Sequence, residues 1–104
     1  MWYVYILRCA DETLYTGVTT DPVRRLAEHQ AGTGAKYTRA HKPLGFAYLE
    51  QQENRSEAQS REWSIKQLSH DEKEMLIQSQ DNDRTLFREL KLALFLRGDG
   101  KQET

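Results

Sequence analysis

Short runs of β-branched and aromatic residues predict two β-strands near the start of the chain. The first covers residues 3–7 and the second residues 14–19, and a polar segment of hairpin-loop length separates them. A third strand is expected over residues 44–50, with apolar residues on both faces, which indicates that helices cover the sheet on both sides. One face of this strand would carry Leu44, Phe46 and Tyr48.

Helical spacing of apolar residues, together with capping signals, predicts four helices. The first begins at Asp21, a good N-cap, with Pro22 in its first turn, and ends at Gly32. A second, capped by Asn54 or Ser56, is expected in the polar region after the third strand, and a third opens with a Ser-x-x-Glu capping box. The fourth lies in the stretch that contains Leu86, Phe87, Leu90, Ala93 and Leu94.

This order of elements predicts an α/β chain of the α+β sandwich type, with a small three-stranded, mostly antiparallel sheet flanked by helices. Residues 1–80 would form one globular domain, residues 81–97 a C-terminal helix packed on it, and residues 98–104 a mobile tail. Residues 32–43, between the first helix and the third strand, are expected to form a glycine hinge followed by a loop.

Cysteine content and hydropathy limit the class of protein. Cys9 is the single cysteine, which excludes an internal disulfide and gives no zinc-ligand cluster. No apolar run approaches the length of a membrane span, and the first residues lack the pattern of a secretory signal. We therefore expect a cytoplasmic protein that does not contact a membrane.

Charge is distributed unevenly along the chain, although the formal net charge is only -1. Residues 22–43 contain five Lys or Arg against one acid, a net charge of +4, whereas residues 49–104 have a net charge of -3. A basic strip of this kind suits salt-dependent binding to phosphates, and the alternative is an ordinary solvated surface. The candidate nucleic-acid-binding residues are Arg24, Lys36, Tyr37, Arg39 and Lys42.

Tyrosines on the first two strands lie close to a cationic helix face. Tyr5 is on the first strand and Tyr15 on its expected antiparallel partner, while Arg25 and His29 are four residues apart on the following helix and point the same way. These are groups that phosphate chemistry uses. Packing of aromatic residues in strands is the structural alternative for the tyrosines.

A carboxylate falls within the inward-facing stripe of the second helix. Glu62 lies four residues after Ala58 and three before Ile65. A carboxylate in that position needs a cation, hydrogen-bond donors or a metal ion, because burying it unpaired is costly. Arg25 is one candidate partner.

The motifs Tyr3-Val4-Tyr5 and Tyr15-Thr16-Gly17, followed by a helix with Arg25-Leu26, resemble the GIY-YIG nuclease family. The runs 34–39 and 61–66 resemble its small stand-alone bacterial branch, and the likeness covers roughly residues 2–78. It implies the fold predicted above.

The resemblance also implies roles for individual residues. Tyr5 or Tyr15 would orient or deprotonate the attacking water, Arg25 would hold the phosphoryl oxygens, and Glu62 would bind Mg²⁺ or Mn²⁺, with Glu57 as a poorer candidate. His29 is a candidate catalytic residue because some family members carry His at this position. It would relay a proton or make a structural hydrogen bond.

The sequence departs from the family pattern in two ways. Tyr3 and Val4 replace the Gly and Ile of the first motif. Many members also carry an Asn some twelve to fifteen residues after the Glu, whereas residues 74–77 contain none and Asn82 lies further on. Contacts that this Asn makes to the phosphate or leaving group are therefore in question.

These observations favour a Mg²⁺-dependent DNA endonuclease that recognises structure or damage rather than sequence, with RNA as an alternative substrate. A non-catalytic nucleic-acid-binding protein of the same fold and a small protein-interaction module are the alternatives. We expect a monomer, with a weak dimer through residues 86–97 as the alternative.

Overall fold

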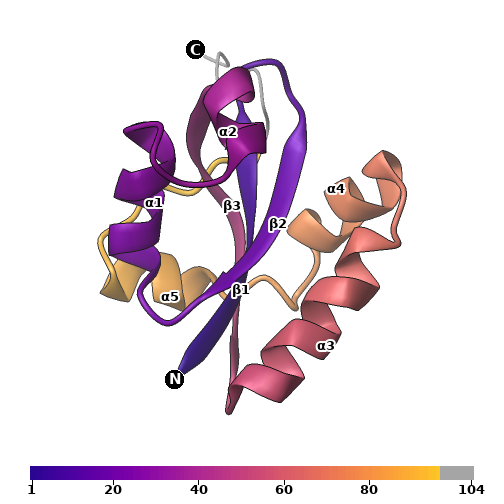
Figure 1. Ribbon diagram of the computed structural model, residues 1–104. Helices are drawn as coiled ribbons and strands as arrows, with labels where there is room; N and C mark the ends of the chain where they lie inside the picture. The colour runs from indigo at the N-terminus through magenta and orange to yellow at the C-terminus, as the bar shows by residue number, and fades with distance from the viewer. Residues whose placement is uncertain (97–104) are drawn as a thin grey trace.

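A computed structural model, which describes residues 1–96, gives a three-stranded antiparallel sheet between two layers of helices (Figure 1). The strands are β1 (Trp2–Cys9), β2 (Leu14–Thr19) and β3 (Pro43–Gln52), in the order β2-β1-β3. The helices are α1 (Pro22–Gln30), α2 (Lys36–His41), α3 (Arg55–Lys66), α4 (His70–Gln78) and α5 (Arg84–Glu89). The predicted sandwich fold and antiparallel sheet are confirmed. None of the helices in the described part of the chain is long and apolar enough to cross a bilayer.

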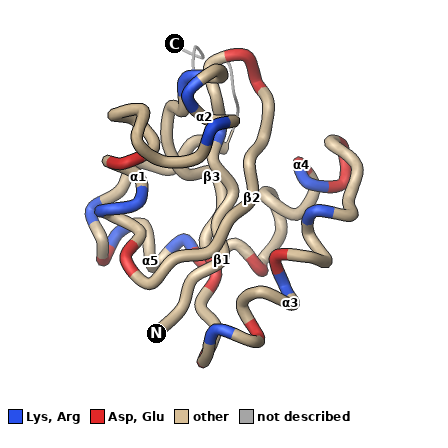
Figure 2. The backbone as a smooth tube through the Cα atoms, viewed as in Figure 1, with Lys and Arg blue, Asp and Glu red and all other residues tan. Residues whose placement is uncertain are grey.

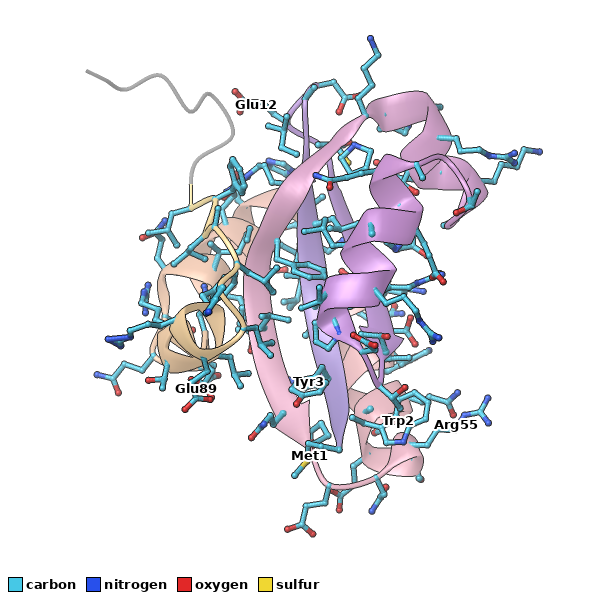
Figure 3. The ribbon with its side chains drawn as sticks, turned by 90° about the vertical axis from the view of Figure 1, so that its left-hand side faces the viewer. Met1, Trp2, Tyr3, Glu12, Arg55 and Glu89 are labelled. Atoms are coloured by element: carbon cyan, nitrogen blue, oxygen red, sulfur yellow. The ribbon has the colours of Figure 1, made fainter. Side chains whose placement is uncertain are left out.

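Alternation along β1 sends its side chains into two separate cores. Val4 and Ile6 pack with Ala58 and Ile65 of α3, on one face of the sheet. Tyr5 and the other odd-numbered residues face the opposite side, where α1 and α5 cover the sheet. Figure 3 shows the same alternation at the start of β1, where Trp2 points toward Arg55 of α3 and Tyr3 points away from it.

A bulge in the pairing of β1 with β3 changes the faces expected for the third strand. Ile6 pairs with Tyr48 but Leu7 pairs with Phe46, so the register shifts by one residue between them. Phe46 therefore lies in the core with Tyr5, whereas Tyr48 lies in the other core. The prediction that Phe46 and Tyr48 share a face was wrong, because simple alternation does not anticipate a bulge.

Local capping fixes the helix that carries Arg25 and His29. The side chain of Asp21 accepts a hydrogen bond from the backbone N–H of Arg24 at 3.1 Å, and Pro22 occupies the first turn. Gly32, with φ of +83°, follows the C-cap residue and lets the chain turn away. The predicted start and end of this helix are confirmed.

Capping of the next two helices also follows the sequence. Asn54 caps α3 by accepting from the backbone N–H of Glu57, which chooses between the two predicted N-caps. Ser69 and Glu72 form a full capping box at the start of α4.

The segment predicted as a loop between the first helix and the third strand contains a helix. α2 begins at Lys36 and ends at His41, and Lys42 then adopts a left-handed conformation with φ of 54°. Six residues are too few to show a clear apolar period, so composition alone suggested a loop. The helix places the basic residues of this segment over the sheet side that carries Tyr5.

The C-terminal helix is shorter than the 81–97 predicted. α5 ends at Glu89, and Lys91 has a φ of 57°, after which the chain runs along β3, where the N–H of Phe95 donates to the carbonyl of Phe46 at 3.0 Å. Leu86 and Phe87 are buried in the core with Tyr5, so the fold has already used the apolar surface proposed for a dimer contact. The predicted mobile tail, residues 98–104, lies outside the described residues.

Candidate active site

A chain of hydrogen bonds links β1, α1 and α2. The hydroxyl of Thr38 donates to the carbonyl of Ala35 at 2.9 Å, so its oxygen accepts from Nδ1 of His29 at 2.8 Å. Nε2 of His29 is then the acceptor, and the phenol of Tyr5 donates to it at 2.8 Å. The network therefore selects one tautomer of His29 and directs its basic nitrogen at Tyr5.

Burial keeps both members of this pair uncharged near neutral pH. Tyr5 and His29 are each only 1% exposed. Desolvation raises the pKa of Tyr5 to about 12, with Arg25 opposing the rise. Desolvation also lowers the pKa of His29 to about 4, and the positive charge of Arg25 adds to this effect. His29 is thus a neutral imidazole that can accept a proton.

Two glycines make room for the pair. Gly17 lies directly across from Tyr5 in the β1–β2 register, and a Cβ atom there would lie 2.4 Å from the Tyr5 hydroxyl oxygen. At Gly34 a Cβ atom would lie 2.6 Å from Nδ1 of His29. The glycine of the second motif thus has a packing reason, which is the close approach of the Tyr5 ring.

Tyr15, the second predicted tyrosine, lies beside Tyr5 and also contacts helix α2. The Tyr15 ring is 6.5 Å from that of Tyr5 and 5.5 Å from that of His29, measured between centroids. Its other neighbour is Tyr37 of α2, at 5.6 Å in a stacked arrangement, and Tyr37 in turn stacks on His41 at 4.1 Å. Tyr15 is partly exposed, so it is the more accessible of the two phenols.

A second contact holds α2 over this site. Nδ1 of His41 lies 2.5 Å from a carboxylate oxygen of Asp11, in the turn between β1 and β2. The backbone N–H of Ala10 also donates to the carbonyl of Lys42 at 2.9 Å. Hydrogen bonds from Thr13, followed by the contact with His41, lower the pKa of Asp11 to about 2. α2 is therefore tied both to the catalytic candidates and to the β1–β2 turn.

Arg25 and Glu62 approach the same phenol from two different elements. Arg25 on α1 is partly exposed and forms an ion pair with Glu28 at 3.0 Å, and contact with Tyr5 and Glu28 raises its pKa. Glu62 on α3 lies close enough for its negative charge to raise the pKa of Tyr5. The structure thus brings Tyr5, Tyr15 and His29 into one cluster with Arg25 beside it, whereas Glu62 reaches the Tyr5 phenol through its charge.

The partner of Glu62 is a lysine on its own helix. Nζ of Lys66 lies 3.1 Å from the Glu62 carboxylate, which is 21% exposed. The alternative in which Glu62 pairs with Arg25 is not what the structure shows. Glu57, the poorer candidate, lies exposed in the first turn of α3.

Comparison with known proteins identifies the family. Residues 1–75 match the family model of the GIY-YIG catalytic domain. The chain belongs to the GIY-YIG nuclease family.

Its relatives include archaeal as well as bacterial proteins. A UPF0213 protein of Natronomonas pharaonis is 55% identical over 75 residues, which cover 72% of this chain and 88% of that protein. A UPF0213 protein of Klebsiella pneumoniae is 43% identical over 90 residues, or 86% of this chain and 85% of the relative. The stand-alone GIY-YIG branch predicted from the sequence is thus confirmed, and it extends beyond bacteria.

A solved structure shows the same fold. The solution NMR structure of the UPF0213 protein BH0048 from Bacillus halodurans is 37% identical in sequence, with a TM-score of 0.51. The match covers 89% of this chain and all of that one.

GIY-YIG nucleases generally depend on a divalent metal ion. Within residues 1–96, no group of three or more His, Cys, Asp or Glu side chains is placed to hold one. Glu62 offers a single, partly exposed carboxylate, which suits Mg²⁺ because that ion keeps several waters and binds through one or two carboxylates plus substrate phosphates. The donor set therefore fits a metal ion shared between Glu62, water and substrate.

Four of the predicted nucleic-acid-binding residues form an exposed basic strip, defined here as Arg24, Lys36, Arg39 and Lys42. Figure 2 shows blue segments along α1 and α2, away from α3 and α4. Tyr37 differs from them, because its ring stacks on Tyr15 and on His41. These contacts hold α2 in place while Tyr37 stays exposed, and its role in nucleic-acid binding remains a prediction.

Several residues of this site were not assigned a role from the sequence. Thr38 orients His29 across nine residues and a glycine turn, a separation that matches no helical or strand period. Gly34 and Thr38 belong to the run that resembles the stand-alone branch, but that run did not indicate their contacts, and His41 was visible only as part of a polar segment. A helix at residues 36–41 would have shown that Tyr37 and His41 lie one turn apart.

Asn82, considered as a replacement for the family's downstream Asn, has a structural position. It is buried, and its amide donates at 2.8 Å to the carbonyls of Ala47 and Ile77 and accepts from the N–H of Leu49 at 3.2 Å. These bonds satisfy the outer edge of β3. The hydrogen bonds described for its side chain are all made to backbone groups of the fold.

Proposed function

We propose that this protein is a divalent-metal-dependent endonuclease that hydrolyses phosphodiester bonds in DNA, selecting DNA structure or damage rather than sequence. The observation that carries the proposal is the Tyr5–His29 hydrogen bond at 2.8 Å, with the charges of Arg25 and Glu62 acting on the same phenol. A buried phenol–imidazole pair between a guanidinium and a carboxylate has the groups that phosphodiester hydrolysis needs.

Geometry favours Tyr5 over Tyr15 as the group that transfers the proton. The attacking water must lose a proton, and a free phenolate at Tyr5 is disfavoured because its pKa is about 12. Tyr5 instead takes the proton from water on its oxygen while its own hydroxyl proton passes to Nε2 of His29, which becomes an imidazolium. Thr38 holds the ring in the orientation that this transfer requires.

Arg25 and Tyr15 would act on the substrate. The planar guanidinium of Arg25 is suited to bind two phosphoryl oxygens at once, and it is partly exposed. Tyr15 is also partly exposed and would position the water or the phosphate with its hydroxyl. A divalent cation bound at Glu62, Mg²⁺ or Mn²⁺, would polarise the scissile phosphate and offset the charge that develops on it.

The basic strip supports a nucleic-acid substrate without a base-specific reader. Its side chains are Lys and Arg on the exposed surface of α1 and α2, which suits contact with backbone phosphates. The part of the chain that the structure describes is one compact unit with no second module beside it. DNA is the proposed substrate, and RNA is the alternative arm of the test.

The test is a cleavage assay on labelled duplex, forked and single-stranded DNA, and on RNA of the same sequence, with Mg²⁺ and with chelator. Wild-type protein should cut at least one DNA structure only when the metal is present. Glu62→Gln keeps the shape of the side chain but removes its charge, so it should fold, bind DNA and fail to cut. Metal-independent cleavage would overturn the role of Glu62, and binding without any cleavage would favour the non-catalytic alternative.

A further inference from the structure

One flank of α3 leads outward from Glu62 and remains exposed. Successive residues of an α-helix are 100° apart around its axis, and Ala58 and Ile65 form the buried stripe of α3. Beside this stripe lies the partly exposed Glu62, and beyond Glu62 the residues are exposed and mostly cationic or neutral. We call them the α3 flank: Arg55, Gln59, Glu62, Trp63 and Lys66. The basic strip lies on α1 and α2, across the sheet from this helix (Figure 1).

Trp63 is the unusual member of this flank. Its side chain is 66% exposed, although an indole is among the largest apolar groups. The ring contacts found in residues 1–96 join Tyr5, Tyr15, Tyr37, Phe46 and the histidines to one another, and Arg55 lies over Trp2 at 5.8 Å. None of them involves Trp63, and most of this residue is exposed, so its ring is accessible to a ligand.

The charges on the two sides of α3 differ. On the side away from the α3 flank, Arg61 pairs with Glu50 at 3.0 Å and with Asp81 at 3.6 Å, so that cation is already compensated. On the α3 flank the carboxylate is Glu62, and the cations are Lys66, which is half exposed, and Arg55. If Glu62 binds a metal ion, Lys66 loses its partner and becomes available for a phosphate. The surface then offers the ammonium group of Lys66 one helical turn from the exposed indole of Trp63.

We propose that the α3 flank is a second nucleic-acid subsite, in which Trp63 stacks on an unpaired base next to the scissile phosphate and Lys66 contacts the adjoining backbone. Trp63 follows Glu62 directly, so their Cα atoms are about 3.8 Å apart, and their side chains leave the helix about 100° from one another on the same flank. A base inside a duplex has both faces covered by its neighbours, whereas a single-stranded base can stack on an aromatic ring. This inference rests on the proposed function and narrows its substrate to forked, flapped or single-stranded nucleic acid.

Binding measured without cleavage tests the subsite directly. Fluorescence anisotropy in chelator compares wild type with Trp63→Ala on a labelled forked DNA and on a fully paired duplex of equal length. The loss of one base–aromatic stack should weaken binding to the fork roughly 5- to 150-fold, while duplex binding through the basic strip changes little. Trp63→Phe should fall between the two proteins, because a smaller ring still stacks.

Met75→Ala is the matched control, since Met75 is an exposed apolar residue on α4 that belongs to neither proposed site. It should bind both DNAs like wild type.

In a Trp2→Phe background, the fluorescence of Trp63 should also be quenched by single-stranded DNA and much less by duplex.

The outcomes separate this inference from the proposed function. Equal binding of wild type and Trp63→Ala to the fork, or equal losses on fork and duplex, would overturn the subsite while leaving the nuclease proposal intact. A change in sedimentation of Trp63→Ala without a change in fork binding would also overturn it, because Trp63 would then contact protein. Wild-type protein that binds neither DNA would count against the proposed function itself.

Discussion

The neutral state of His29 makes a prediction about stability that does not depend on any substrate. Its pKa in the folded protein is about 4, whereas 6.5 is the ordinary value. Between these two pH values the unfolded chain binds a proton that the folded protein does not, so the free energy of unfolding falls as the pH is lowered. The linkage relation gives a loss of about 2.4 kcal/mol between pH 7 and pH 4.5 from this one group.

Urea unfolding at pH 7 and at pH 4.5 would measure the effect, with His29→Gln and His41→Gln as comparison variants. Wild type should lose about 2 kcal/mol more than His29→Gln over this range, because glutamine has no proton to gain. His41 is also a histidine but lies partly exposed beside Asp11, so His41→Gln should keep most of the wild-type pH dependence. The same pH dependence in wild type and His29→Gln would refute the neutral, buried state of His29.

The same shift sets the acidic limit of activity. If neutral His29 accepts the proton from Tyr5, cleavage should persist below pH 6 and decline only as His29 titrates near pH 4. A kcat/KM profile against pH, limited to the range in which the protein remains folded, would show this limb. A decline centred near pH 6.5 would mean that the titrating histidine is exposed in the active form.

Three further substitutions follow from the contacts of the site. Gly17→Ala would place a methyl group 2.4 Å from the Tyr5 hydroxyl. It should therefore lower the free energy of unfolding in urea by about 1–3 kcal/mol and sharply reduce cleavage. A normal cleavage rate would show that the Tyr5–His29 hydrogen bond is dispensable. Arg25→Ala should lower kcat/KM by orders of magnitude. It should change the free energy of unfolding by under about 0.5 kcal/mol, because the ion pair of Arg25 with Glu28 is at the surface. A destabilised but active variant would contradict this prediction. A triple variant should bind DNA more weakly and release about three fewer counterions on binding, with the changes Lys36→Ala, Arg39→Ala and Lys42→Ala. If the slope of affinity against salt concentration did not change, the role of the basic strip in DNA binding would be refuted.

Sequence periodicity anticipated the parts of the fold that local chemistry determines. Asp21 and Pro22 at the start of α1, and the capping box at Ser69, each satisfy backbone groups within one helical turn, so their positions follow from neighbouring residues. The bulge in β3 could not be read in the same way, because it depends on the partner strand. The alternation that predicted Phe46 and Tyr48 on one face of the sheet fails because the register with β1 shifts by one residue between Ile6 and Leu7.

The candidate site likewise has features that neighbouring residues predict and features that depend on distant parts of the chain. Arg25 and His29 lie on one helix face at a spacing that the sequence displays, and the two tyrosine motifs follow from adjacent strands. The direction in which His29 presents its basic nitrogen depends instead on Thr38 and the carbonyl of Ala35, which belong to a segment with no visible period. Sequence therefore identified the chemical groups, whereas their tautomers and order of contact required the three-dimensional arrangement.

The resting site separates its neutral and charged members. The proposed proton-transfer pair, Tyr5 and His29, is buried and held by uncharged hydrogen bonds, which give it a fixed geometry without the desolvation cost of buried ions. Arg25 and Glu62 are partly exposed, and each has a partner of opposite charge on its own helix, Glu28 at 3.0 Å and Lys66 at 3.1 Å.

Ion pairs of this exposed, intrahelical kind contribute only about 0.3–0.5 kcal/mol. A phosphate that takes Arg25 from Glu28, and a metal ion that takes Glu62 from Lys66, would therefore displace little stabilising energy. The proton-transfer pair can remain rigid through these exchanges, because neither Tyr5 nor His29 has to change partners for the substrate to bind. Substrate and metal would thus complete the charges of a site whose proton path is already formed.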